Sequence, residues 1–240
     1  MPNAHRVLIG IQARSTSKRF PGKVFEDIGG KPLLTHVIDA CKSAEHYMNR
    51  KVALTGIVVN TALLIPYDDE LKRHYKGSLP IVEGPEDDVL ARYAMAARQF
   101  DSTYVVRVTG DCPLIPAFII SKHVNIATRN SYDYLSNVDE KVRTAADGMD
   151  CEVISRRLLD FVDQTATDAD DRQHVTTFVR RCPPHWATRA PVVGHLDLSG
   201  MKLSVDTPED LERVRLAYNR LQEILKNAEK VYGQRSVHRV

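Results

Sequence analysis

Short apolar runs rich in β-branched residues recur along this chain of 240 residues and alternate with segments of helical periodicity. This alternation is typical of βαβ units, in which helices connect the strands of a mainly parallel sheet and cover both of its faces. It therefore predicts an α/β fold of three layers. The expected strands are residues 6–11, 52–60, 79–83, 103–108, 151–154 and 203–205. The expected helices are residues 33–47, 68–75, 86–99, 116–128, 156–164, 170–181 and 208–232.

One segment, residues 131–150, interrupts the alternation because it is polar and poorly periodic. We interpret it as an excursion from the sheet, partly extended, that caps a site or contacts a partner. The chain length suits one large α/β domain or two small ones. Because the sequence contains no internal repeat and no low-complexity linker, we expect a single domain over residues 1–240 with this excursion inserted.

Charge and composition limit the class of ligand. The sequence has 33 Lys and Arg residues against 31 Asp and Glu residues, a net charge of +2, which disfavours a nucleic-acid partner but allows a compact anion. The apolar run at residues 7–11 is too short for a signal peptide, and no run approaches the ~20 apolar residues of a membrane span. The four cysteines form no C-x-x-C pair, which disfavours a zinc site and a secreted disulfide framework. We therefore expect a cytoplasmic protein that does not bind a membrane.

A basic loop, residues 12–23, follows the first expected strand. It contains four cations, three hydroxyl residues and no acid. In open α/β sheets ligands bind where strand ends and helix starts converge, so this position favours an anion such as a triphosphate. The chain has neither a G-x-G-x-x-G nor a G-x-x-x-x-G-K-[ST] motif, which weighs against a dinucleotide-binding oxidoreductase and a P-loop NTPase. The alternative interpretation is a solvated basic loop. The cations are Arg14, Lys18, Arg19 and Lys23.

Two aspartates follow β-rich runs and are expected at strand ends. Asp111 comes after residues 105–110, and Asp206 comes after residues 203–205. Mg²⁺ is commonly bound by one or two carboxylates together with substrate phosphates, so this pair is a candidate metal site. The alternative is helix capping, which we expect of Asp206 in any case because Thr207-Pro208-Glu209 follows it.

Six motifs in order resemble the cytidylyltransferases that make CMP-activated acidic sugars, in particular the SpsF branch of spore-coat polysaccharide biosynthesis. The keto-deoxyoctulosonate and acylneuraminate synthetases are more distant relatives. The resemblance spans residues 7 to about 216 and implies a nucleotide-diphospho-sugar-transferase-like, Rossmann-like fold. Departures at Thr16, Ala146, Gln173 and Thr177 lie mostly toward the acceptor end. The motifs are residues 11–33, 86–93, 106–115, 147–153, 174–176 and 204–211.

The resemblance implies Mg²⁺-dependent transfer of CMP from CTP to an anionic sugar-like acceptor in surface-glycan biosynthesis, with release of pyrophosphate, by a homodimer that pairs through residues 131–150. The implied catalytic residues are Arg14, Lys23, Asp111 and Asp206, of which Asp111 and Asp206 hold the metal. The implied nucleotide-binding residues are Gln12, Ala13, Arg14, Ser15, Ser17, Arg19, Lys23, Gly84, Asp87, Arg92, Thr109 and Gly110. The implied acceptor-binding residues are Asp147, Gly148, Asp150, Glu152 and His174.

Two alternatives stay open at this point. One is a nucleotide-binding scaffold without turnover, although the candidate metal ligands and phosphate cations are all present. The other is a nucleotidyltransferase that uses a different nucleoside triphosphate, although the G-x-G-T-R loop usual in sugar-1-phosphate nucleotidyltransferases is absent.

Overall fold

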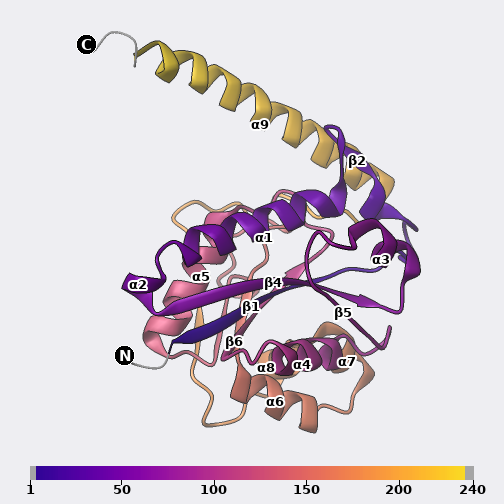
Figure 1. Cartoon of the computed structure of the whole chain (residues 1–240), viewed down its shortest axis with the longest axis vertical. Coiled ribbons are helices and arrows are strands. Elements are labelled where there is room, and N and C mark those ends of the chain that lie inside the picture. Colours follow the sequence, from indigo (N-terminus) through magenta and orange to yellow (C-terminus); the bar gives the residue numbers. More distant parts are fainter. Residues whose placement is uncertain (1–3, 236–240) are drawn as a thin grey trace.

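The computed structural model describes residues 4–235, and within them the main sheet has the strand order β5-β4-β1-β6-β8-β7-β9 (Figure 1). β5, β4, β1 and β6 are parallel, β8 runs antiparallel to β6 and β7, and β9 is parallel to β7. A short antiparallel hairpin, β2–β3, lies apart from this sheet. The strands are β1 His5–Gln12, β2 Asp27–Ile28, β3 Lys31–Pro32, β4 Ile57–Pro66, β5 Ile81–Gly84, β6 Tyr104–Thr109, β7 Tyr134–Ser136, β8 Glu152–Ser155 and β9 Arg189–Pro191.

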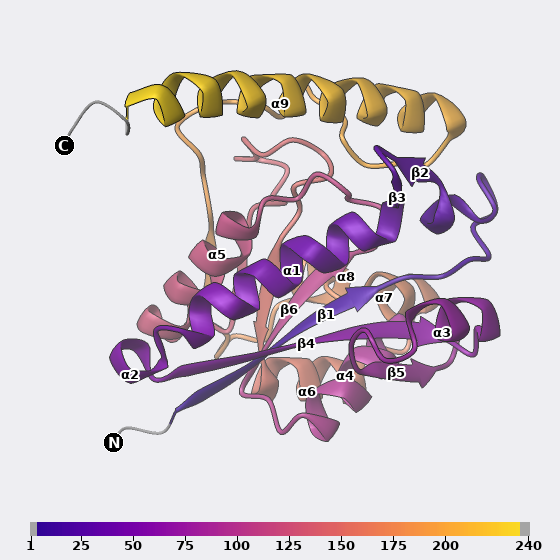
Figure 2. The ribbon, with the colours of Figure 1, turned by 45° about the horizontal axis from the view of Figure 1, so that its top comes forward.

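Helices cover both faces of the sheet, as the alternation of the sequence predicts. Alternate residues of β1 enter different cores: Ile9 packs in the cluster that contains Leu34 and Val124, and Leu8 packs in the cluster that contains Tyr93. Figure 2 shows α1 and α5 on one side of the strands and α4 and α6 on the other. The helices are α1 Leu33–Asn49, α2 Val52–Thr55, α3 Asp69–Tyr75, α4 Val89–Gln99, α5 Ala117–Asn130, α6 Arg156–Thr165, α7 Ala169–His174, α8 Thr177–Arg181 and α9 Pro208–Arg235, with a 3-10 turn at Lys23–Phe25.

The three-layer α/β prediction is confirmed, but several boundaries are wrong. Residues 52–55, expected at the start of a strand, form α2, which ends at Gly56 in the left-handed region. Residues 203–205 form no strand, and only an isolated bridge joins Lys202 to Asp147. The expected helix 170–181 is divided into α7 and α8 at Val175. Within the expected excursion, Tyr134–Ser136 belongs to the main sheet as β7, so the chain leaves the sheet only after Ser136.

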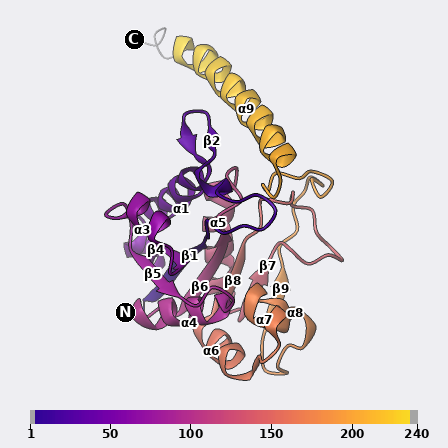
Figure 3. The same cartoon turned by 90° about the vertical axis from the view of Figure 1, so that its right-hand side faces the viewer.

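The long helix α9 projects from the body of the molecule (Figure 3). Its first turns are anchored, because Leu211 and Val214 pack with Ile28 of the β2–β3 hairpin. Farther along, the side chains of Leu216 and Ile224 are exposed. Among the described residues no helix has the length and apolar character needed to span a membrane.

Candidate active site

A cavity of about 540 Å³ lies at the carboxyl ends of β1 and β6. Its lining has more cations than carboxylates and therefore suits a polyanion. The charged lining residues are Arg14, Lys18, Arg19, Lys23, Arg92, Arg107, Asp111, Asp147, Asp150 and Asp206. The other lining residues are Gln12, Ala13, Ser17, Val24, Val89, Thr109, Gly110, Cys112, Gln173, His174 and Ser204.

The pairing of β1 with β6 brings the basic loop beside Asp111. Gln12 pairs with Thr109 in register, and the N–H of Gly110 donates a hydrogen bond of 2.8 Å to the carbonyl of Gln12. A Cβ atom at Gly110 would lie 2.9 Å from that carbonyl oxygen and from the Cβ of Ala13. Glycine is therefore required here because the two backbones approach so closely.

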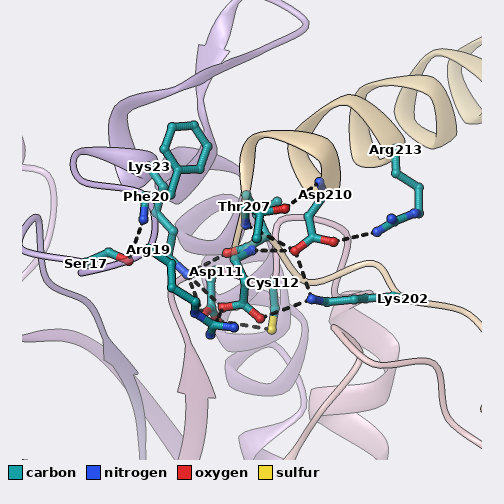
Figure 4. Close-up of polar contacts among 12 residues, drawn as sticks. Ser17, Arg19, Phe20, Lys23, Asp111, Cys112, Lys202, Thr207, Asp210 and Arg213 are labelled. Carbon is teal, nitrogen blue, oxygen red and sulfur yellow. Dashed lines mark hydrogen bonds and ion pairs between the residues drawn. The ribbon is translucent and has the colours of Figure 1, made fainter.

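Asp111 and Asp206 converge on the ammonium group of Lys23. Figure 4 shows Asp111, Arg19 and Lys202 gathered at this cluster. The Nζ of Lys23 lies 3.0 Å from Oδ2 of Asp111 and 3.3 Å from Oδ1 of Asp206, and it donates to the carbonyl of Val205 at 2.5 Å. Arg19 reaches Asp206 at 2.8 Å. Burial alone would raise the pKa of Asp111, but Lys23, with help from the Thr109 hydroxyl, holds that pKa below its ordinary value. Asp111 is therefore ionised, and both carboxylates point at one cation position.

Helix α9 begins with a capping box that does not use Asp206. The hydroxyl of Thr207 accepts from the N–H of Asp210 at 3.3 Å, and the carboxylate of Asp210 accepts from the N–H groups of Thr207 and Asp206. The prediction that Asp206 caps α9 is therefore wrong, because Thr207 and Asp210 accept the hydrogen bonds from the N–H groups at the start of this helix. The carboxylate of Asp206 is left to Lys23, Arg19 and Lys202.

The donor set suits a hard divalent cation. Two carboxylates and the Val205 carbonyl already surround one positive charge, and Mg²⁺ prefers such oxygen ligands together with substrate phosphates. Within residues 4–235 no group of three or more His, Cys, Asp or Glu side chains could hold a metal ion alone. Water and substrate oxygens would complete the coordination of a metal here.

Arg92 reaches the cavity from α4 and is 2% exposed, and its Nε and Nη1 have no hydrogen-bond partner among the described residues. Burial lowers the pKa of this guanidinium. A buried, unpartnered cation at a cavity wall is a strong candidate to bind an anionic or carbonyl oxygen. Gly84, predicted to bind the nucleotide, lies outside the lining, and a Cβ there would be 2.7 Å from Cγ of Arg92.

Two other predicted nucleotide-binding residues also lie outside the lining. Ser15 donates from its N–H and its hydroxyl to Asp68, so that serine fastens the loop to the start of α3. Asp87 is exposed on the segment before α4, where the neighbouring Asp88 caps the helix and pairs with Arg172 at 2.7 Å. Asp68 and Asp88 are the N-cap residues of α3 and α4, so the side chains of both have a local structural role.

The predicted acceptor-binding residues divide into two groups. Asp147, Asp150 and His174 line the cavity. Burial raises the pKa of Asp150 to about 6, although Arg143 lies 2.5 Å away. Gly148 and Glu152 do not line it. A Cβ added at Gly148, whose φ is +102°, would lie 2.5 Å from the backbone of residues 203–204, and Glu152 is buried with its carboxylate on Arg107, which does line the cavity.

A family model described as cytidylyltransferase matches residues 8–236. The chain belongs to the cytidylyltransferase family. It is 26% identical over 222 residues to the spore coat polysaccharide biosynthesis protein SpsF of Bacillus subtilis, covering 90% of this chain and 88% of SpsF.

Solved structures of similar fold include cytidylyltransferases. The chain is similar to a cytidylyltransferase from Leptospira borgpetersenii serovar Hardjo-bovis, with a TM-score of 0.79, 26% identity and coverage of 95% of this chain and 96% of that chain. A CMP:2-keto-3-deoxy-manno-octonic acid synthetase complexed with CTP shares the fold, with a TM-score of 0.65, 14% identity and coverage of 90% and 99%. The resemblance found in the sequence motifs is thereby confirmed.

The site of this cytidylyltransferase contains residues that the sequence analysis did not select. Arg107, Gln173 and Ser204 line the cavity, and Lys202 pairs with Asp206 just outside it. A signal for Arg107 was present, because a lone cation interrupts an otherwise apolar β6. Such a cation inside a buried strand needs a partner, and its partner is Glu152 at 2.5 Å.

Proposed function

We propose that this cytidylyltransferase transfers CMP from CTP to an acidic sugar in surface-glycan biosynthesis, with Mg²⁺, and releases pyrophosphate. The observation that carries the proposal is the convergence of Asp111 and Asp206 on one cation position beside a cavity rich in cations. Nucleotidyl transfer needs positioning and charge stabilisation more than covalent chemistry, and such a cavity supplies both.

The reaction forms a bond between an acceptor oxygen and the α-phosphorus of CTP while the bond to the leaving pyrophosphate breaks. Arg14, Lys18 and Arg19 surround the triphosphate and neutralise charge as it accumulates on pyrophosphate. Lys23 moves from between the carboxylates to these phosphates. Arg92 binds an oxygen of the nucleotide with its unpartnered guanidinium nitrogens. Asp111 and Asp206 would hold Mg²⁺, which would supply Lewis-acid stabilisation of the phosphate charge.

The acceptor half of the cavity is formed by Asp147, Asp150 and His174, and Arg107 joins it to the nucleotide half because its Nε donates to Gln12. Hydroxyl groups of a sugar suit the two aspartates, and a carboxylate suits Arg107.

We further propose a cytoplasmic homodimer. The free thiols of the four cysteines and the exposed apolar residues of α9 support it, and analytical ultracentrifugation tests the dimer.

Pyrophosphate release tests the proposed reaction. The enzyme is incubated with Mg²⁺ and each of CTP, UTP, ATP and GTP, together with acidic sugars such as 3-deoxy-manno-octulosonate and N-acetylneuraminate and their neutral counterparts. We expect release with CTP and an acidic sugar, and at least about tenfold less with UTP, because an unpaired buried polar group costs roughly 1–3 kcal/mol. Equal rates with CTP and UTP would refute the choice of base, and transfer only to neutral sugars would refute the acidic acceptor.

A further inference from the structure

Glu152 is a buried carboxylate that holds three elements of the structure together. It lies on β8, is 2% exposed, and pairs across the strands with Arg107 of β6, whose Nη1 is 2.5 Å from Oε2. The hydroxyl groups of Tyr134 and Thr176 both donate to its other oxygen, Oε1. Burial alone would raise the pKa of Glu152, but Arg107 and the two hydroxyl groups bring it below its ordinary value. Glu152 is therefore an ionised carboxylate without access to substrate.

The ion pair fixes an amide on the nucleotide side of the cavity. The Nε of Arg107 donates to Oε1 of Gln12 at 3.0 Å, and both side chains line the cavity floor. Because a guanidinium can only donate, the Gln12 amide must turn its oxygen toward Arg107. The NH₂ group of Gln12 is then directed away from Arg107 as a hydrogen-bond donor. Glu152 thus sets the orientation of a group that it does not touch.

The third partner, Thr176, belongs to a strained turn on the acceptor side. The N–H of Thr176 donates to the carbonyl of His174 at 2.6 Å across Val175, which has φ 63° and ψ −56°. This is a γ-turn with positive φ, a rare conformation that is strained for a β-branched residue. Val175 is 1% exposed and packs in the core cluster under α4 and α6, and Thr176 is fully buried with its hydroxyl on Glu152. These contacts hold the turn, and the turn ends α7 with His174 in the cavity lining.

We propose that Glu152 is a positioning residue that sets the nucleotide half of the site relative to the acceptor half, through Arg107 and Gln12 on one side and through the strained turn behind His174 on the other. The naming of these halves rests on the proposed function, whereas the positioning itself is a property of the protein alone. An in-line attack requires the two substrates to be held in register, and a misplacement of about 1 Å can cost 10²-fold in rate.

Side-chain ¹⁵N resonances of the free protein test the proposal without any substrate. The Gln12 amide and the His174 imidazole are followed in the wild type, in Glu152→Gln and in Thr176→Val. We expect Glu152→Gln to shift both resonances. Thr176→Val keeps the ion pair and the side-chain shape, so it should shift His174 and leave Gln12 in place. This milder variant keeps the test valid if Glu152→Gln folds poorly.

Asp133→Asn is the matched control. Asp133 is a buried carboxylate near the opposite end of β8, bound by Arg157 and by the hydroxyl of Ser155 at 2.7 Å. Its loss should lower the melting temperature while leaving the Gln12 and His174 resonances unchanged. The proposal is overturned if Glu152→Gln or Thr176→Val leaves the His174 resonance in place, or if Asp133→Asn shifts both resonances as strongly.

Binding and turnover give a second, separate readout. In Glu152→Gln the rate of CMP transfer to the acidic sugar should fall about 10²-fold, which is a larger loss than that of CTP affinity measured by calorimetry. Equal losses in CTP affinity and rate would indicate a general loosening of the fold and would overturn the positioning role. If wild-type enzyme transfers CMP to no acidic sugar, the proposed function fails, but the resonances still decide the role of Glu152.

Discussion

Replacement of Lys23 by methionine should destabilise the protein in the absence of divalent cations and create a dependence on them. The side chain of Lys23 is 10% exposed and those of Asp111 and Asp206 are 29% and 21% exposed. At 3.0 and 3.3 Å, Coulomb's law with an effective dielectric constant of about 20 assigns about 5 kcal/mol to each contact as an upper bound. Desolvation and partial exposure reduce the net effect, so we expect Lys23→Met to lower the free energy of unfolding by about 2–3 kcal/mol.

Magnesium should reverse this loss, because the two carboxylates that lose their ammonium partner can bind Mg²⁺. A cation at a hundred times its dissociation constant stabilises the folded state by about 2.7 kcal/mol, enough to recover the loss. Urea unfolding is therefore measured in EDTA and in excess Mg²⁺, without nucleotide, for wild type and Lys23→Met. Lys202→Met is the control, because Lys202 also contacts Asp206 at 3.2 Å but is 37% exposed, and it should change stability by less than about 1 kcal/mol. Equal stabilisation of wild type and Lys23→Met by Mg²⁺ would refute the reasoning.

Three further changes have defined outcomes. Asp111→Ala should reduce pyrophosphate release by at least about 10³-fold, or about 4 kcal/mol of barrier, with an unchanged circular dichroism spectrum, and near wild-type turnover would contradict its assignment as a metal ligand. Gly84→Ala should push Arg92 aside and weaken CTP binding about tenfold by calorimetry, whereas Gly200→Ala, with open space around it, should have no effect; equal affinities would show that Arg92 does not bind the nucleotide. Burial alone would raise the pKa of Asp133, but its hydrogen bonds, chiefly those from Arg157, lower it from 3.8 to about 2, so it contributes stability above pH 4 that is lost as the pH falls to 2. That contribution is about 2 kcal/mol, and urea titrations of Asp133→Asn should lack this acid limb.

The sequence alone determined the class of fold and the phosphate side of the site. Strand and helix periodicities are local, so the alternation of the chain predicted the layers even where boundaries shifted, as at residues 52–55. The place of the basic loop and of Asp111 in the site could also be predicted, because each directly follows a buried strand and ligands bind at the strand ends of an α/β sheet. The sequence did not show which residues cap α9, because the side chains of Asp206, Thr207 and Asp210 can all accept a hydrogen bond from the backbone of a helix start. Only the structure shows that Thr207 and Asp210 accept these bonds.

Only the tertiary structure decided which charges meet. Lys23 lies 88 residues from Asp111 and 183 residues from Asp206 in the chain, so its place between them depends on how the loop and α9 pack against the end of β6. Glu152 was predicted to bind the acceptor because it lies within the family motif at residues 147–153, yet the antiparallel register of β8 with β6 places it opposite Arg107, away from the cavity lining. The physical reason is that a buried charge is stable only with a partner, and that partner is chosen by strand pairing across 45 residues of chain, which no local pattern encodes.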